Sequence, residues 1–400
     1  RMLDADPKNA EVIFPYINGD DLNSDPEQRP SRWVINFWDW PEERAREYEL
    51  PWQWIEERVR PERQRRNERG EFVLRKPLPE RWWQYADKRP ALYHAIGRGR
   101  DFERHPEGWM LDPEPDERVI GITRVSKFLN AAFLPNDRIF TLDLFVFALS
   151  DARDLALLQS SIHDVWTRKH SSTQETRMRY TATDSFETMP LPADLGALTE
   201  IGESYSKLRS SLMQDKQLGL TKLYNRFHIA AEGDPRIGDL RALQCKMDVA
   251  VARAYGWNDI ELGHGFHEVP YLPENDRMRF TISEPARLEV LRRLSELNRL
   301  RYEEEVARGL HGGKQAVASI PKPRARSAKP QQLSQPMLDF GDISANEGGY
   351  LKVAEPTAHH QNNNPTRTLL DHLQANPRWH AKAEIIGATG ISDGQWNTSV

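Results

Sequence analysis

The feature that most constrains the fold is a β-rich region at residues 117–150. Three short runs rich in apolar, β-branched and aromatic residues stand there, at 118–123, 130–134 and 139–149, and Pro135-Asn136-Asp137 separates the last two. The third run is apolar almost throughout, with Asp143 as its one charged residue. Such continuity is typical of a strand covered on both faces. We therefore expect 139–149 to be a central strand.

Helical patterns dominate the chain after this region. Residues 151–168 place Leu155, Leu158, Ile162, Val165 and Trp166 at three- to four-residue spacing, which predicts one helix with a single buried stripe. Helical periodicity returns at 194–225, 237–254 and 284–308, with a short strand at 279–282, and two further strands are expected at 11–17 and 32–38. The predicted class is α+β: a twisted mixed or antiparallel sheet with flanking helices, followed by a helical domain.

The composition changes again near residue 311. Residues 314–329 contain five Lys or Arg and no acid, and Gln, Asn, Pro and Gly follow, a mixture that cannot bury a core. Short helical patterns at 368–373, 381–388 and 392–400 surround turn signals. We predict a domain at 1–192, a helical domain at 193–310, a disordered linker at 311–364 and a truncated helix-turn-helix, winged-helix-like module at 365–400.

Several function classes lack their sequence signatures. The single cysteine, Cys245, cannot form a disulfide framework, and no apolar stretch approaches the roughly 18 residues of a membrane span. Glycine-rich phosphate loops, metalloprotease motifs and serine-hydrolase elbows are missing. Residues 376–379, Asn-Pro-Arg-Trp, miss the adenine-methylating tetrapeptide by one residue, and residues 264–268, His-Gly-Phe-His-Glu, have the wrong order for a zinc signature. We interpret both as structural loops and expect no metal and no catalytic residue.

Basic residues gather locally although the net charge is −5. Residues 58–104 contain 14 Lys or Arg against 7 Asp or Glu, with Arg75 and Lys76 among them. Arginines with interleaved aromatics suit phosphate contacts, but the neighbouring glutamates equally favour a salt-bridged helix surface. Both readings stay open, whereas Trp82 and Trp83 are expected in the core.

Two further segments have the chemistry of nucleic-acid contacts. Residues 168–180 combine Arg and Lys with hydroxyl side chains, and residues 124–127 form a turn of sequence Arg-Val-Ser-Lys. Cations and hydroxyls suit phosphates, whereas Arg, Glu and Gln suit base edges. Each segment alone is equally readable as an ordinary polar loop.

A set of motifs in fixed order adds a family resemblance over about residues 10–310. It comprises Asp20-Asp-Leu-Asn-Ser-Asp-Pro26, Pro30-Ser-Arg-Trp-Val-Ile-Asn-Phe37, Trp82-Trp-Gln-Tyr-Ala86, Thr123-Arg-Val-Ser-Lys127, and the segments 158–166, 179–192 and 219–228. These motifs resemble the C-terminal target-recognition half of MmeI/Eco57I-like adenine-N6 DNA methyltransferases. That family comprises the single-chain type IIG/IIL restriction-modification enzymes and related phage-defence methylases.

The resemblance implies a DNA-recognition role and assigns residues to it. Base-reading positions fall on Arg124, Lys127, Thr173, Glu175 and Arg177. Contacts with the DNA backbone fall on Arg168, Lys169, Ser171, Ser172, Arg179 and Tyr180, to which the basic stretch adds Arg75 and Lys76. The chain would position double-stranded DNA so that the target adenine flips into a catalytic domain.

That catalytic domain is not present in this sequence, which lacks Asn-Pro-Pro-Tyr and a cofactor-binding motif. The resemblance therefore implies that S-adenosylmethionine binds to a methyltransferase domain upstream of Arg1 or on a separate subunit, and that this chain binds no cofactor. Restriction activity of the parent protein is left open. The protein would be cytoplasmic and nucleoid-associated in a prokaryote, with no membrane partner. The alternative is a stand-alone DNA-binding specificity or adaptor subunit of a multi-protein defence complex.

Overall fold

The computed structural model describes residues 1–105, 115–174 and 177–309, and its class is α+β, as the sequence predicts. The strands are β1 (Ile13–Ile17), β2 (Arg32–Ile35), β3 (Arg118–Thr123), β4 (Val125–Ser126), β5 (Ala131–Pro135), β6 (Ile139–Phe140), β7 (Leu144–Phe147), β8 (Ser172–Gln174), β9 (Arg177–Arg179), β10 (Gly265–Glu268) and β11 (Met278–Thr281). The predicted linker and helix-turn-helix module lie outside the described residues.

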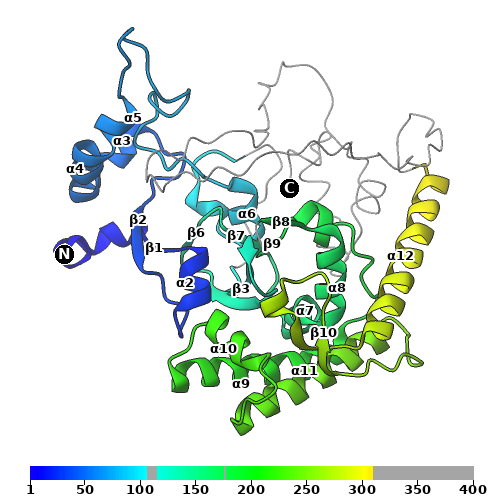
Figure 1. Cartoon of the computed structure of the whole chain (residues 1–400). Coiled ribbons are helices and arrows are strands. Elements are labelled where there is room, and N and C mark those ends of the chain that lie inside the picture. Colours follow the sequence, from blue (N-terminus) through cyan, green and yellow to red (C-terminus); the bar gives the residue numbers. More distant parts are fainter. Residues whose placement is uncertain (106–114, 175–176, 310–400) are drawn as a thin grey trace, which may run out of the picture.

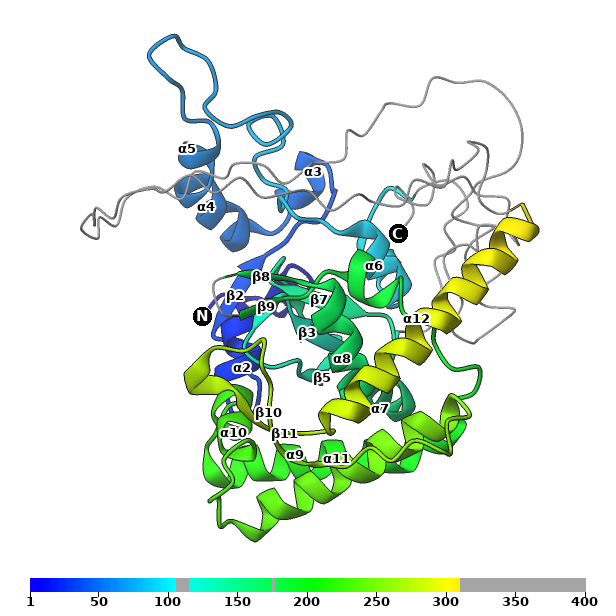
Figure 2. The same cartoon turned by 45° about the vertical axis from the view of Figure 1, so that its right-hand side comes forward.

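The described strands form small separate sheets instead of one continuous sheet. The first has the order β2-β1-β6, in which β1 is antiparallel to β2 and parallel to β6. Two antiparallel sheets have the orders β5-β3-β7 and β4-β9-β8, and β10 and β11 form a hairpin. These sheets lie near the middle of the molecule, as Figure 2 shows.

Helices surround the sheets on several sides (Figure 1). The shorter ones are α1 (Met2–Ala5), α2 (Gly19–Ser24), α3 (Glu42–Ala45), α4 (Glu49–Arg58), α5 (Arg60–Arg63) and α6 (Pro90–Ala95). Those that follow the sheets are α7 (Ala152–Gln159), α8 (Ser161–His170), α9 (Thr199–Lys216), α10 (Leu220–Phe227), α11 (Pro235–Ala254) and α12 (Glu284–Ala307). No described helix is long and apolar enough to cross a membrane.

The predicted central strand at 139–149 is wrong in its extent and place. The run divides into β6 and β7, which belong to different sheets, and Leu142 between them is 49% exposed. A turn closes the break, since the amide of Leu144 donates to the carbonyl of Thr141. The central strand is β3, whose residues after Arg118 are all buried. Apolar continuity marks burial, but it does not reveal a tight turn inside the run.

The predicted helix at 151–168 is interrupted at Ser160. This residue has an extended backbone and ends α7, while its hydroxyl accepts from the amide of His163 and caps α8. The five predicted stripe residues are all buried, so the predicted inner face is confirmed. Gly202 of α9 sits so close to α7 that a Cβ would lie 2.0 Å from the carbonyl oxygen of Ala152.

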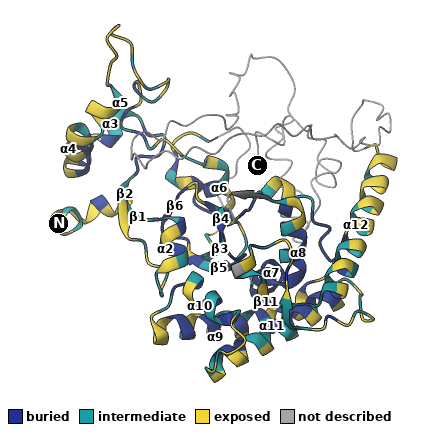
Figure 3. Cartoon of the chain, viewed as in Figure 1, coloured by how far each residue is buried: buried dark blue, intermediate teal, exposed yellow. Residues whose placement is uncertain are grey.

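Most buried side chains belong to one large hydrophobic cluster, which extends from Val12 to Leu294 and includes Trp82. Residues on both sides of the predicted boundary at 192/193 contribute to it, while the division into domains stays a prediction. A second, smaller cluster lies between β3 and α7 and includes Met178 and Tyr180. Figure 3 shows much of α12 as exposed.

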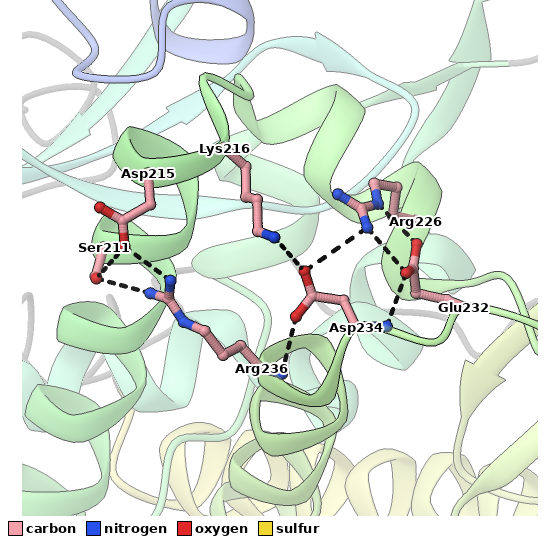
Figure 4. Close-up of polar contacts among 7 residues, drawn as sticks. All are labelled: Ser211, Asp215, Lys216, Arg226, Glu232, Asp234 and Arg236. Carbon is pink, nitrogen blue, oxygen red and sulfur yellow. Dashed lines mark hydrogen bonds and ion pairs between the residues drawn. The ribbon is translucent and has the colours of Figure 1, made fainter.

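A network of ion pairs ties α9, α10 and α11 together (Figure 4). Arg236 contacts Asp215 at 2.7 Å, and Lys216 contacts Asp234 at 2.9 Å. Asp234 also caps α11, because its carboxylate accepts from the amide of Arg236. Arg226 contacts Glu232 at 2.7 Å. These charged side chains therefore hold α9, α10 and α11 together, and we assign them a structural role.

Candidate nucleic-acid interface

The sheet β4-β9-β8 brings together the two segments predicted to read DNA. In its register Val125 pairs with Arg179, and Ser126 pairs with Met178. On the other side of β9, Ser172 pairs with Arg179 and Gln174 with Arg177. The turn at 124–127 and the segment 168–180, more than 40 residues apart in sequence, are therefore neighbours in one small sheet.

Alternation along β9 separates an exposed face from a buried face. Successive residues of a strand point to opposite sides, and here Arg177 and Arg179 are exposed while Met178 is buried. Met178 and the following Tyr180 insert into the smaller hydrophobic cluster. Tyr180 contacts Phe145 with ring centroids 5.4 Å apart. The sheet is thus anchored by its inner side and offers arginines on its outer side.

Tyr180 belongs to this core, which corrects its assignment as a backbone contact. The side chain is 1% exposed, and its hydroxyl lies 3.4 Å from Nε2 of His163. Burial raises the pKa of Tyr180 above its ordinary value. A phosphate could reach this hydroxyl only if the cluster opened, so Tyr180 positions β9 instead.

Three predicted contacts are cations without an acidic partner. Among the described residues, no carboxylate forms an ion pair with Arg124, Lys169 or Arg179. Arg124 is half-buried, with its guanidinium 5.4 Å from the ring centre of Phe145, whereas Lys169 and Arg179 are exposed. An unpaired cation loses no ion pair when it binds a phosphate. These three are the best-placed anion contacts of the predicted set.

Arg89, which the sequence analysis did not single out, stabilises the turn next to Arg124. The guanidinium of Arg89 donates to the carbonyls of Thr141 at 3.2 Å and Phe140 at 3.4 Å, at the turn between β6 and β7. In the same turn, the backbone carbonyl of Asp143 accepts a hydrogen bond from the backbone amide of Arg124 at 2.7 Å. Burial lowers the pKa of Arg89, and the charge of Arg124 adds to this effect. Its place in the basic stretch was the only available signal.

Two other predicted contacts are already engaged inside the protein. Lys127 lies 2.8 Å from the carboxylate of Asp276 and donates to the side chain of Asn225. Arg168 has a side chain only 15% exposed and contacts Asp164 at 2.8 Å. Either cation would have to exchange its carboxylate for a phosphate to bind DNA.

The hydroxyl and acidic positions are less fully defined. Ser171 ends α8, and its hydroxyl lies 2.8 Å from that of Ser185. Ser172 and Thr173 lie in β8, where Thr173 pairs in register with Met178. Glu175 lies outside the described residues. The roles of these four positions stay predictions.

The described contacts of the basic stretch 58–104 are ion pairs and structural hydrogen bonds, and its reading as a phosphate-contacting surface stays a prediction. Arg60 pairs with Glu56 one helical turn away, and Arg98 is buried, donating to the carbonyls of Asn136 and Arg138. Arg75 and Lys76 are exposed in the loop after α5, which extends away from the sheets in Figure 1, and Lys76 pairs with Glu80. These two residues therefore do not join the cations around β4-β9-β8.

Residues 264–268, predicted to be a loop, mostly form strand β10 (Gly265–Glu268), and their histidines make structural contacts. Nε2 of His264 lies 2.9 Å from the buried carboxylate of Asp248 on α11, and Nε2 of His267 bonds the carbonyl of Gly263. Burial alone would lower the pKa of His264, but the bonds to Asp248 and Cys245 outweigh burial and raise it to about 9. At neutral pH the imidazolium of His264, just before β10, therefore links this strand to α11.

Comparisons with known proteins give one finding of fold. No protein family matches the sequence, and no curated protein matches it. A solved structure of the type IIL restriction-modification enzyme MmeI, determined in complex with DNA, matches 75% of this chain with a TM-score of 0.45 and 14% sequence identity. The match covers 32% of that protein, so this chain spans about a third of its length. The chain is structurally similar to part of MmeI.

Proposed function

We propose that this chain is the DNA sequence-recognition part of an S-adenosylmethionine-dependent adenine-N6 DNA methyltransferase from a restriction-modification or phage-defence system. One observation carries the proposal: β4-β9-β8 joins the 124–127 turn to the 168–180 segment and surrounds the joint with Arg124, Lys169 and Arg179, unpaired with any described carboxylate. The ordered sequence motifs support the same role.

The geometry suggests a division of labour among the cations. Phosphate contacts fix the register of a protein on DNA, whereas base-edge contacts in the groove read the sequence. Lys169, beside the end of α8, and Arg179, at the end of β9, suit the backbone role. Arg124 and Arg177 suit base edges, because an arginine fork bonds guanine in a bidentate way.

The remaining predicted positions would complete the interface. Thr173 and Glu175 belong to the segment that would enter the groove, and Ser171 and Ser172 offer hydroxyls beside it. Lys127 and Arg168 would join by exchanging Asp276 and Asp164 for phosphates.

The chemistry of methylation would belong to the catalytic domain. The sequence of this chain contains neither Asn-Pro-Pro-Tyr nor a cofactor motif, and the proposal therefore assigns S-adenosylmethionine to the catalytic domain. The contribution of this chain would be to hold the duplex so that the target adenine can leave the stack. The cofactor would supply the methyl group in the other domain.

The proposal is tested by the pattern of adenine methylation in the host genome, with and without the gene. We expect one asymmetric motif to lose its N6-methyladenine on deletion. Complementation with Arg177→Ala should relax the motif at one base pair, because a good bidentate contact supplies about 1–3 kcal/mol of discrimination. Complementation with Arg292→Ala, an exposed arginine of α12, is the matched control and should restore the original motif.

If the methylome is unchanged, binding of the purified chain to duplex DNA distinguishes a stand-alone specificity subunit from a protein without a DNA-recognition role. Binding that falls with salt, with a slope that Arg179→Gln flattens by about 1, would support the stand-alone specificity subunit. Absence of duplex binding in the full chain would refute a DNA-recognition role altogether.

A further inference from the structure

A cavity of about 80 Å³ lies beside the proposed interface, between α8, α10 and the β10-β11 hairpin. Its walls come from the segment after β4, the middle of α8, the end of α10, the hairpin and the first turn of α12. The DNA-reading assignment does not use this cavity. Arg168 lines it, however, and Lys127 adjoins it through Phe128.

Three arginines from three elements converge on the cavity. Arg168, Arg279 and Arg287 line it, and their side chains are 15%, 6% and 20% exposed. Each arginine has one carboxylate partner among the described residues: Asp164, Asp276 and Glu284, respectively. Asp276 is shared, because Lys127 contacts it too at 2.8 Å. Glu268, the other lining carboxylate, pairs with Arg277. The lining thus contains as many carboxylates (Asp164, Glu268 and Glu284) as arginines, and Lys127 adds one cation at the edge of the cavity.

Two buried polar groups of the wall lack partners. Asn130 is 4% exposed, and neither its amide nitrogen nor its amide oxygen has a hydrogen-bond partner among the described residues. Arg279 is 5% exposed, and its Nε has no partner either. Buried polar groups are nearly always bonded, and leaving one unpaired is costly. Two unpaired N–H groups in one wall suit an acceptor-rich ligand.

His228 adds a further donor to the same wall. Its Nδ1 accepts the amide of Phe280 at 3.1 Å, so the neutral ring carries its proton on Nε2. Burial lowers the pKa of His228 well below its ordinary value, and the charges of Arg279, Arg168, Lys127 and Arg241 lower it further. Burial, reinforced by these positive charges, therefore keeps the ring neutral at physiological pH.

We propose that this cavity is a binding site for a phosphate group, held by Arg168, Arg279 and Arg287 with Asn130 in the wall. Guanidinium groups match the geometry of phosphate oxygens. The size limits the ligand, because one water needs about 10–15 Å³ of such space and drug-sized ligands need about 300 Å³ or more. A single tetrahedral oxyanion fits, whereas a nucleobase or a whole nucleotide does not.

The test is calorimetric titration of the full chain with sodium phosphate, against sodium chloride at matched ionic strength. We expect saturable binding of phosphate that Arg287→Gln weakens about tenfold, as expected for one charge-assisted hydrogen bond. Arg292→Gln is the matched control: this residue also pairs with a glutamate three positions earlier on α12, but it does not line the cavity. It should bind phosphate like the unaltered chain.

A second variant guards against a folding defect. Asn130→Ala removes an amide that bonds no described residue, so the fold should tolerate it while phosphate affinity falls. The site is overturned if phosphate binding does not saturate, or if both Arg287→Gln and Asn130→Ala bind as tightly as Arg292→Gln.

Two sources of the phosphate are separated by adding duplex DNA. If the site takes a phosphate of the DNA backbone, free phosphate will compete with the duplex beyond the effect of salt, and Arg287→Gln will weaken duplex binding. If it takes a free phosphate, both ligands will bind together. Phosphate binding without duplex binding would refute the proposed function alone, and duplex binding without phosphate binding would refute this site alone.

Discussion

The cations around β4-β9-β8 and those of α12 are similar in type but differ in their partners. On α12, Arg292 contacts Glu289 and Glu296, Arg293 contacts Glu289 and Asp259, and Arg299 contacts Glu303. Around the sheet, Arg124, Lys169 and Arg179 contact no described carboxylate. A charge run in a sequence therefore does not identify a binding surface. The lack of a described acidic partner is a further indication, because a cation without such a partner loses no ion pair when it binds an anion.

A third kind of arginine is buried in the core, where it has a purely structural role. Arg209 of α9 is 2% exposed, and its described partners are hydrogen-bond acceptors, with no described carboxylate among its ion pairs. It donates to the carbonyl of Ala131 at 2.7 Å and to the side chain of Gln159 at 3.1 Å. It thereby joins β5, α7 and α9 inside the core.

The largest effect on stability is expected from Arg209→Met. This change leaves the buried carbonyl of Ala131 without its Arg209 donor, at about 1–3 kcal/mol, and removes one of the two donors to the amide oxygen of Gln159, which also accepts from the amide of Ala131. We expect the free energy of unfolding to fall by about 3 kcal/mol, measured by urea denaturation. An unchanged denaturation midpoint would show that Arg209 is not a structural link between β5, α7 and α9.

The next effect is a loss of stability in alkaline solution. His264 has its pKa raised to about 9 in the folded protein by Asp248, against about 6.5 in the unfolded chain. Its contribution is thus fully present below pH 6.5 and is lost as the pH rises through 9. The full shift corresponds to somewhat more than about 3 kcal/mol, and solvent screening at the partly exposed ring reduces it to about 2–3 kcal/mol.

Urea denaturation at pH 6.5 and pH 9.5 measures this loss. His264→Gln serves as the control, since it removes the titrating group and should flatten the pH dependence. An equal pH dependence in both proteins would assign the loss to other groups.

The smallest effect on stability is expected where an arginine of the β4-β9-β8 sheet and an arginine of α12 are replaced in the same way. Arg179→Gln and Arg292→Gln each remove one exposed positive charge, and we expect each to change the free energy of unfolding by less than about 0.5 kcal/mol. Their effects on duplex affinity should differ, because Arg292 pairs with Glu289 and Glu296, whereas Arg179 lies close to the predicted reading positions and has no ion pair with a described carboxylate. Fluorescence anisotropy with a labelled duplex measures this. Equal loss of affinity in both variants would show that the contrast in ion pairing has no functional meaning.

The sequence by itself determined the kinds of elements and the buried stripe of α7 and α8, since hydrophobic periodicity records which face is covered. It also marked the two segments, 124–127 and 168–180, whose residue types suit DNA. These properties depend on neighbours along the chain.

Tertiary structure alone decided how the pieces meet. It divided 139–149 at a turn that Arg89 supports, and it made β3 the central strand. It buried Tyr180 and gave Lys127 and Arg168 acidic partners, while Arg179 has no acidic partner among the residues that the structure describes. The physical reason is that ion pairs and sheet registers join residues far apart in sequence. Asp276, 149 positions after Lys127, neutralises it, and no local pattern contains that information.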